Sequence, residues 1–240
     1  MRNKKPILCV QKSENSKNLA FDFCYSALLG AEYMGHKVKT FKDVSELSGD
    51  PYNIIVGSVE QCSKWLSLNN YKIPETLYRE ELIPFLRRSC EIMHIDCARE
   101  LAFPYFIKPY DQIKAFTGFV AHDKLILDIF SEGYSGNVIV QEPIDIVSEY
   151  RIYVHNNKVI DMKHYAGDWK EFPSDTGKLI RTCFQCIPYK AFTIDVGVYD
   201  GSMCLIECND MWAIGNYGLE PKDYYLAIKD RWLQITGILK

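Results

Sequence analysis

The sequence predicts a mixed protein, with a small α/β layer at the N-terminus and a larger β-rich α+β region after it. Strand-like and helix-like segments alternate over residues 1–75, which is the pattern of an α/β layer. From residue 103 onward, short apolar segments follow one another, and two pairs of them have the pattern of β-hairpins. The length of 240 residues, with 48% hydrophobic and 25% charged residues, suits a globular chain of one large or two smaller domains.

The N-terminal α/β layer is expected to form from three strands and two helices. The first apolar segment is too short for the core of about 7–15 residues that a signal peptide needs, so we interpret it as a strand. Apolar residues at helical spacing predict a first helix that stops at a glycine. The strands are expected at 6–10, 37–42 and 52–58, and the helices at 19–35 and 59–70.

The rest of the chain divides into a connector and a β-rich domain. Residues 76–102 are helical in composition and interrupted at Pro84, so we expect a helical connector between domains at 1–75 and 103–240. Strands are expected at 105–109, 116–122, 124–130 and 137–143, hairpins at 149–165 and 192–210, and a terminal helix at 221–235.

Composition excludes several classes of function. The net charge of −3 gives no overall attraction to nucleic acid, and no apolar run reaches the roughly 18 residues of a membrane helix. Nine cysteines without a framework favour a reducing compartment, and we expect a cytoplasmic protein. Cys183, Cys186, Cys204 and Cys208 leave a zinc site as an alternative, but buried thiols are the favoured interpretation.

The stretch "CLIECND", residues 204–210, is a buried strand that ends in polar side chains. Glu207 and Asn209 are two apart, so they point to one face of the strand. Asp195 lies on the partner strand of the same hairpin. Two carboxylates and an amide are oxygen ligands that suit Mg²⁺ or Mn²⁺. The alternative is an exposed hairpin end with solvated acids.

The metal interpretation requires an irregular hairpin. With a two-residue turn at Asp200 and Gly201 and a regular ladder, Asp195 opposes Ile206 and faces away from Glu207. A bulge or a three-residue turn places the two carboxylates directly opposite each other. They would then repel, unless a cation reverses the sign of the interaction. A metal site therefore predicts a bulge or a longer turn in this hairpin.

Four basic residues fall in or beside the expected strands of the β-rich region: Lys108, Lys114, Arg151 and Lys163. A lysine is almost never fully buried unless it has a partner, and an anionic ligand is one such partner. The alternative for each residue alone is a surface charge on an edge strand. The four together point more strongly to an anion site than any one of them does.

The segment "VIVQEP" ends a strand with two polar residues and a proline. A backbone that stops pairing offers its free amide and carbonyl groups to a ligand. Glu142 belongs to this segment and Glu149 follows it by seven residues, and such carboxylates could accept hydrogen bonds from ribose hydroxyls. An ordinary strand end with solvated acids explains this segment equally well.

Together these segments resemble the ATP-grasp superfamily, and most closely its R2K group. The resemblance rests, in chain order, on "YFIKP", "KAFTG", "VIVQEP", "SEYRIYV", "TIDVGV" and "IECNDMWAIGNYG". They span about residues 103–218, and the preceding α/β segment resembles the small domain that precedes the grasp. The resemblance implies an ATP-grasp fold, in which two β-rich subdomains clasp ATP.

The resemblance also implies roles for particular residues. At the nucleotide these are Lys108 for the α- and β-phosphates, Lys114 as the second lysine of the group, Gln141, Glu142 and the Ile144 backbone for the adenine, and Glu149 for the ribose. The remaining sets are Arg151 with Lys163 at the phosphates or the acyl phosphate, and Asp195, Glu207 and Asn209 for one or two Mg²⁺ (or Mn²⁺) ions. Lys108, Arg151 and Lys163 would supply the catalytic positive charge.

The activity implied is that of an ADP-forming carboxylate–amine ligase, which activates a carboxylate as an acyl phosphate. A phosphotransferase on the same scaffold and a non-catalytic nucleotide-binding module are the alternatives. An amino acid, peptide or other small molecule is the expected substrate, and a macromolecular acceptor stays an alternative. Weaker candidates on the acceptor side are Arg181, His164, Trp212, Asn216 and Tyr217. For Trp212, Tyr217 and His164, a structural role is the favoured interpretation.

Overall fold

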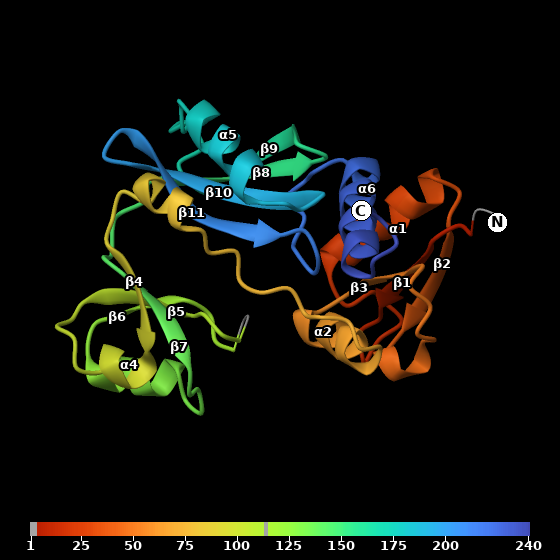
Figure 1. The fold of residues 1–240 in the computed structure, drawn as a ribbon, viewed down its shortest axis with the longest axis horizontal. Coiled ribbons are helices and arrows are strands. Elements are labelled where there is room, and N and C mark those ends of the chain that lie inside the picture. The colour runs from red at the N-terminus through yellow and green to blue at the C-terminus, as the bar shows by residue number, and fades with distance from the viewer. Residues whose placement is uncertain (1–3, 113–114) are drawn as a thin grey trace.

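The structure is a computed structural model that describes residues 4–112 and 115–240. Within these residues the chain forms three sheets, and Figure 1 shows two of them on one side of the molecule and the N-terminal layer on the other. No helix among the described residues has both the length and the apolar character that crossing a membrane requires.

The N-terminal layer is a parallel sheet with the strand order β2-β1-β3, as the alternating pattern predicts. Gly35 follows the first helix with φ of +65°, a conformation that glycine adopts without strain. The elements of the layer are β1 (Ile7–Gln11), α1 (Asp22–Tyr33), β2 (Lys37–Phe41), η1 (Val44–Glu46), β3 (Asn53–Val56) and α2 (Val59–Leu68).

The C-terminal helix α6 (Pro221–Ile235) returns to the N-terminal layer and lies beside α1 (Figure 1). Trp232 and Tyr224 of α6 are fully buried in the same core as Leu8 and Trp65. The last helix of the chain therefore completes the core that the first 75 residues begin. The division into domains at 1–75, 76–102 and 103–240 stays a prediction.

The second sheet is antiparallel with the order β4-β7-β5-β6, and two short helices accompany it. Residues 124–130, expected as a strand, form a helix instead. The Asp123 side chain caps this helix by accepting from the Ile126 amide, and Leu127 is its buried residue. The elements of the second sheet and its two helices are β4 (Cys90–His94), α3 (Ile95–Ala98), β5 (Tyr105–Pro109), β6 (Phe119–Ala121), α4 (Lys124–Phe130) and β7 (Asn137–Gln141).

The expectation of helix throughout residues 76–102 is wrong. A 3₁₀ helix, η2 (Glu80–Phe85), is followed by the strand β4, which pairs with β7 and places Cys90 opposite Gln141. Pairing with a strand that lies 47 residues further along the chain overrides the local helical composition.

The third sheet is antiparallel with the order β11-β10-β8-β9, so β11 is an edge strand. Both expected hairpins are confirmed. Helix α5, which the sequence pattern did not predict, packs its buried Leu179 and Cys183 against Ile152 and Ile194 of the sheet. The elements are β8 (Ser148–His155), β9 (Lys158–Gly167), α5 (Gly177–Cys186), β10 (Ala191–Tyr199) and β11 (Ser202–Asp210).

The contact between α1 and α6 is tight at Gly30. A Cβ atom built at Gly30 would lie 2.1 Å from the Pro221 carbonyl oxygen and 2.5 Å from Tyr225 Cβ. We predict that Gly30→Ala lowers the free energy of unfolding by about 1–3 kcal/mol, because backbone atoms must move to admit the methyl group. Urea unfolding measures the change.

The matched control is Leu29→Ala, at a neighbouring residue that is 53% exposed. It is expected to stay within about 0.5 kcal/mol of the wild type. A Gly30→Ala protein as stable as the wild type would contradict the close approach of the two helices.

Candidate active site

The hairpin of β10 and β11 contains a bulge beside its acidic residues. Its turn has two residues, Asp200 and Gly201, with φ of 49° and 64°, as in a tight hairpin. The ladder then shifts by one residue, so Ile206 has no partner and Asp195 lies opposite Glu207. The irregularity that a shared acidic face requires is therefore present, as a bulge in the strand and not as a longer turn.

Asp195 is buried against Arg151 on the neighbouring strand β8. Arg151 Nε donates to Asp195 Oδ1 at 2.8 Å, and Nη2 donates to Oδ2 at 2.6 Å. Burial raises the pKa of Asp195, and the bonds and charge of Arg151 oppose that rise. The Arg151 guanidinium also lies 4.6 Å from the centre of the Tyr217 ring. The pair fixes the Arg151 guanidinium in the interior of the sheet, with its charge balanced by Asp195.

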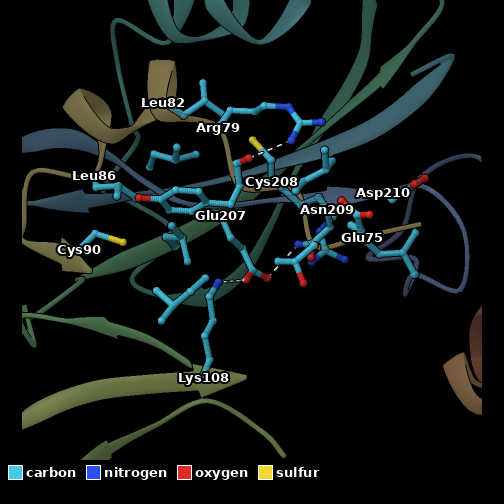
Figure 2. Close-up of a pocket in the computed structure, with 18 of the residues that line it drawn as sticks. Glu75, Arg79, Leu82, Leu86, Cys90, Lys108, Glu207, Cys208, Asn209 and Asp210 are labelled. Atoms are coloured by element: carbon cyan, nitrogen blue, oxygen red, sulfur yellow. Dashed lines mark hydrogen bonds and ion pairs between the residues drawn. The ribbon is translucent and has the colours of Figure 1, made fainter. Parts of the chain in front are cut away.

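Lys108 and Glu207 form an ion pair between two different sheets. Lys108 Nζ, on β5, donates to Glu207 Oε2, on β11, at 2.6 Å (Figure 2). Burial opposes the ionisation of Glu207, but the charge and hydrogen bond of Lys108 outweigh it and lower the pKa of Glu207 to about 2. The pair holds a lysine and a carboxylate, from opposite walls, within one cavity.

Asn209 joins the two carboxylates into one cluster. Its Nδ2 donates to Glu207 Oε1 at 2.8 Å and to Asp195 Oδ2 at 3.3 Å. Two carboxylates and one amide in contact are a donor set that hard divalent cations favour. The three residues expected as metal ligands are therefore brought together, but both Asp195 oxygens are bonded to Arg151, and no group of three or more acidic, histidine or cysteine side chains among the described residues could hold a metal ion.

A cavity of about 300 Å³ runs along the edge strand β11 between the two antiparallel sheets and the N-terminal layer. Its charged and polar lining comes from both sheets and includes Lys108, Arg151, Glu207 and Asn209. Its apolar lining includes Leu77, Leu82, Leu86, Ile139 and Leu205. In Figure 2, Leu86 and Cys90 lie on one side of Glu207, and Asp210 and Glu75 lie on the other.

The segment that links the N-terminal layer to η2 forms a wall of this cavity, which the sequence pattern did not reveal. Residues 75–79 line the cavity. Thr76 Oγ1 donates to the Tyr110 carbonyl at 2.9 Å, and Arg79 Nε donates to the Cys186 carbonyl at 3.3 Å. These bonds fix the segment to the residue that follows β5 and to the end of helix α5.

The residues expected to bind the nucleotide divide into two groups. Lys108, Arg151 and Gln141 line the cavity, and Gln141 is only 4% exposed. The described residues of the expected set that do not line it are Glu142, Ile144, Glu149 and Lys163. Lys114 lies outside the described residues.

Two of the residues away from the cavity have partners of their own. The Tyr165 hydroxyl forms a hydrogen bond with the Glu149 carboxylate. Lys163 pairs with Asp161 at 2.8 Å on β9, the edge strand. Lys163 is nevertheless the cross-strand neighbour of Arg151, so both side chains point to the same face of the sheet.

Two of the weak acceptor candidates line the cavity. Trp212 is 5% exposed, and Tyr217 is 43% exposed. Asn216 closes its own loop by donating to the Leu219 carbonyl at 3.0 Å and accepting from the Leu219 amide at 2.6 Å. The loop after β11 is therefore held by Asn216; Tyr217 is open to a ligand, whereas Trp212 packs in the core of the N-terminal layer.

The other two candidates are not brought to the cavity. Arg181 is exposed on α5, which packs on the sheet face opposite to Arg151. His164 packs edge-on against the Tyr150 ring, with 5.0 Å between ring centres. The position of His164 follows from strand alternation, because it is adjacent to Lys163 and must point to the other face.

Sequence reasoning missed two arginines that hold the acidic strand. Arg231 of α6 forms a bidentate pair with Asp210 at the end of β11, with Nε–Oδ1 at 2.7 Å. Arg88 donates to the carbonyl groups of Leu205 and Ile206. Neither arginine lies in an apolar strand, so no pattern singled them out.

A family model described as "ATP-grasp domain, R2K clade family 2" matches residues 85–227. No curated protein matches the chain by sequence.

Three solved structures resemble the fold. The D-alanine–D-alanine ligase from Bacillus anthracis has a TM-score of 0.59 and 12% identity, with 98% of this chain and 99% of that chain covered. A RimK domain ATP-grasp protein from Sphaerobacter thermophilus has a TM-score of 0.58 and 11% identity, with the same coverage. N5-carboxyaminoimidazole synthetase from Staphylococcus aureus has a TM-score of 0.53 and 14% identity, with 94% of this chain and 77% of that chain covered. At this identity the likeness shows the fold, which is the ATP-grasp arrangement.

The buried Arg151–Asp195 pair is expected to contribute to stability. Asp195→Asn leaves the Arg151 guanidinium in a buried site without a compensating charge, so we predict a loss of about 3 kcal/mol in the free energy of unfolding. The measurement is urea unfolding in the presence of a chelator.

Asp161→Asn is the control, because its pair with Lys163 has side chains that are 32–33% exposed. A change below about 1 kcal/mol is expected there. Equal effects of the two substitutions would contradict the burial of the Arg151–Asp195 pair.

Proposed function

We propose that this chain, which belongs to the R2K clade of ATP-grasp proteins (family 2), is an ATP-dependent ligase that activates a carboxylate as an acyl phosphate. The observation that supports this most directly is the cavity along β11. Lys108 and Glu207, from separate sheets, meet there with Arg151 beside an apolar wall, and Asp195 lies behind Arg151 without lining the cavity. A nucleotide needs such a combination, because its base is apolar on both faces and its phosphates are strongly anionic.

Within this proposal the base occupies the apolar side, near Leu86 and Cys90, and the phosphates lie near Lys108 and Glu207. Lys108 now neutralises Glu207. A nucleotide with its metal ion would replace both partners of that pair, because Lys108 would then bind a phosphate and Glu207 would be free to hold the metal ion.

The proposed reaction has two steps. A carboxylate oxygen of the substrate attacks the γ-phosphorus of ATP, the bond to the β–γ bridging oxygen breaks, and ADP and an acyl phosphate form. An amine then attacks the acyl carbon, phosphate leaves, and the proton lost by the amine passes to phosphate or solvent. The D-alanine–D-alanine ligase among the structural neighbours has a name that fits this class of reaction.

The residues of the chain serve this chemistry by binding and by fixed charge. Arg151 is held by Asp195 and faces Tyr217, so its charge is in place before any ligand enters. Glu207 and Asn209 would hold Mg²⁺ or Mn²⁺, with Asp195 beside them in its pair with Arg151, and the metal ion would supply positive charge to the phosphates. No nucleophilic serine or cysteine is required.

The substrate class is proposed to be an amino acid, a peptide or another small molecule. The loop after β11 places Trp212 and Tyr217 at the cavity, and Arg151 donates to the Gly215 carbonyl of the same loop at 3.4 Å. An acceptor bound against this loop would lie beside the fixed positive charge of Arg151. We also propose a cytoplasmic location.

Lys108→Ala is predicted to weaken the binding of ADP by about 10- to 100-fold, since a hydrogen bond to a charged group contributes about 1.5–3 kcal/mol. Calorimetry with ADP and Mg²⁺ measures the change. Lys124→Ala, at an exposed residue of α4, is the control and should bind as the wild type does. Undiminished affinity in Lys108→Ala would remove the lysine from the phosphate site.

Glu207→Gln is predicted to lower turnover by about 100-fold or more, because a bound metal ion supplies several kcal/mol of transition-state stabilisation. The assay follows ADP and phosphate release over pairs of carboxylate and amine substrates. Glu91→Gln, an exposed change on β4, is the control. ADP release with a phosphorylated product and no free phosphate would favour a phosphotransferase over a ligase.

A further inference from the structure

Arg88 makes a set of contacts that the reaction as described does not use. It follows η2 and precedes β4, and its guanidinium lies against the edge strand β11. Nη1 donates to the Leu205 carbonyl at 2.9 Å, and Nη2 donates to the Ile206 carbonyl at 3.2 Å. Burial lowers the pKa of this guanidinium, so the charge has exchanged water for these protein acceptors.

The two carbonyl contacts reveal the shape of the strand at the bulge. In a regular strand, successive carbonyl groups point to opposite edges, so one planar group cannot bond to two in a row. Ile206 is the residue without a ladder partner, and the bulge turns its carbonyl to the edge that Leu205 also faces. The fork of an arginine fits two neighbouring oxygens, and the single ammonium of a lysine does not.

The same guanidinium reaches the other sheet. Arg88 Nε donates to Gln141 Oε1, at the end of β7, at 3.0 Å. Because arginine has no acceptor, it fixes the Gln141 amide with its oxygen toward Arg88. The Gln141 Nε2 group is then turned to Cys90 Sγ at 3.3 Å. Arg88 thus ties β7 to β11 at the apolar side of the cavity.

We propose that Arg88 is a positioning residue that holds the bulge at Ile206 and thereby keeps Glu207 opposite Asp195. The inference rests on the proposed function, since it assigns Arg88 a part in preparing the metal and nucleotide site. Without the bulge, a shift of one residue would turn Glu207 to the other face of the sheet. Arg88 acts on the metal ligands through the backbone and touches neither carboxylate.

Arg87 provides a matched control on the same hairpin. It donates to the carbonyl groups of Tyr199 and Ser202, at the turn, and its guanidinium lies over the Tyr199 ring. It is an arginine adjacent to Arg88 that also bonds to strand carbonyls, but far from the bulge along the ladder. Replacing either arginine would loosen the hairpin in general, whereas only the replacement of Arg88 would remove the bulge.

The first test is the binding of Mn²⁺ to the full-length protein in the presence of ADP, for Arg88→Lys, Arg88→Ala, Arg87→Lys and Arg87→Ala. Loss of a residue that orients metal ligands typically lowers metal affinity by 10- to 100-fold. We expect that loss in both Arg88 variants, without rescue by lysine, and wild-type affinity in both Arg87 variants. Equal Mn²⁺ affinity in the Arg88 variants and the wild type would overturn the proposal.

The second test is amide hydrogen exchange in the ligand-free protein, which does not depend on the proposed function. We expect faster exchange at residues 205–208 in Arg88→Lys than in the wild type, and no such change there in Arg87→Lys. Unchanged exchange at the bulge would overturn the role of Arg88. If the wild type binds neither ADP nor Mn²⁺, the proposed function fails, and the exchange experiment still decides whether Arg88 holds the bulge.

Should Arg88→Ala fail to fold, Arg88→Lys decides both tests, because it keeps the charge and most of the side-chain length. Urea unfolding of all four variants provides the reference for stability. A loss of Mn²⁺ affinity in Arg88→Lys at wild-type stability supports positioning. A loss that appears equally in Arg87→Lys would show only a loosened hairpin and would contradict the proposal.

Discussion

The site depends on Ile206, the one residue of β11 that has no partner in β10. The turn of this hairpin is tight, so a regular ladder would leave Asp195 and Glu207 on opposite faces. The bulge brings both acids to the face that carries Arg151, and it places them next to Asn209. Because β11 is an edge strand, the carbonyl groups at the bulge are open to Arg88 from the neighbouring layer.

Charge balance is the second constraint on the cavity. Each buried acid has one basic partner: Asp195 has Arg151 within its own sheet, and Glu207 has Lys108 from the other sheet. The two pairs differ in how accessible they are to a ligand. The Arg151–Asp195 pair is bidentate and almost fully buried, whereas the Glu207 side chain of the second pair is 34% exposed. The Arg151–Asp195 pair is therefore the fixed part of the site, and Lys108 with Glu207 is the part that a ligand can exchange.

Much of this arrangement could be predicted from the sequence, because alternation fixes which side chains share a face. Glu207 and Asn209, and the need for a bulge opposite Asp195, follow from counting residues along two strands. The helix at 124–130 and the strand at 90–94 could not be predicted, since short apolar segments suit either structure until a capping residue or a partner strand decides. Arg88 gave no local signal, because its role exists only once β7 and β11 lie beside it. The wall at residues 75–79 could not be predicted for the same reason, because it forms only through tertiary contacts.

The central claim is that the acids of this hairpin and the lysine of the other sheet form one site for a metal-bound nucleotide. A crystal structure with ADP and Mn²⁺, in which anomalous scattering locates the metal, tests it most directly. The account predicts a manganese peak in contact with Glu207 and Asn209, with Lys108 moved from Glu207 to a phosphate. A nucleotide bound elsewhere, or Lys108 still paired with Glu207 beside a bound nucleotide, would contradict it.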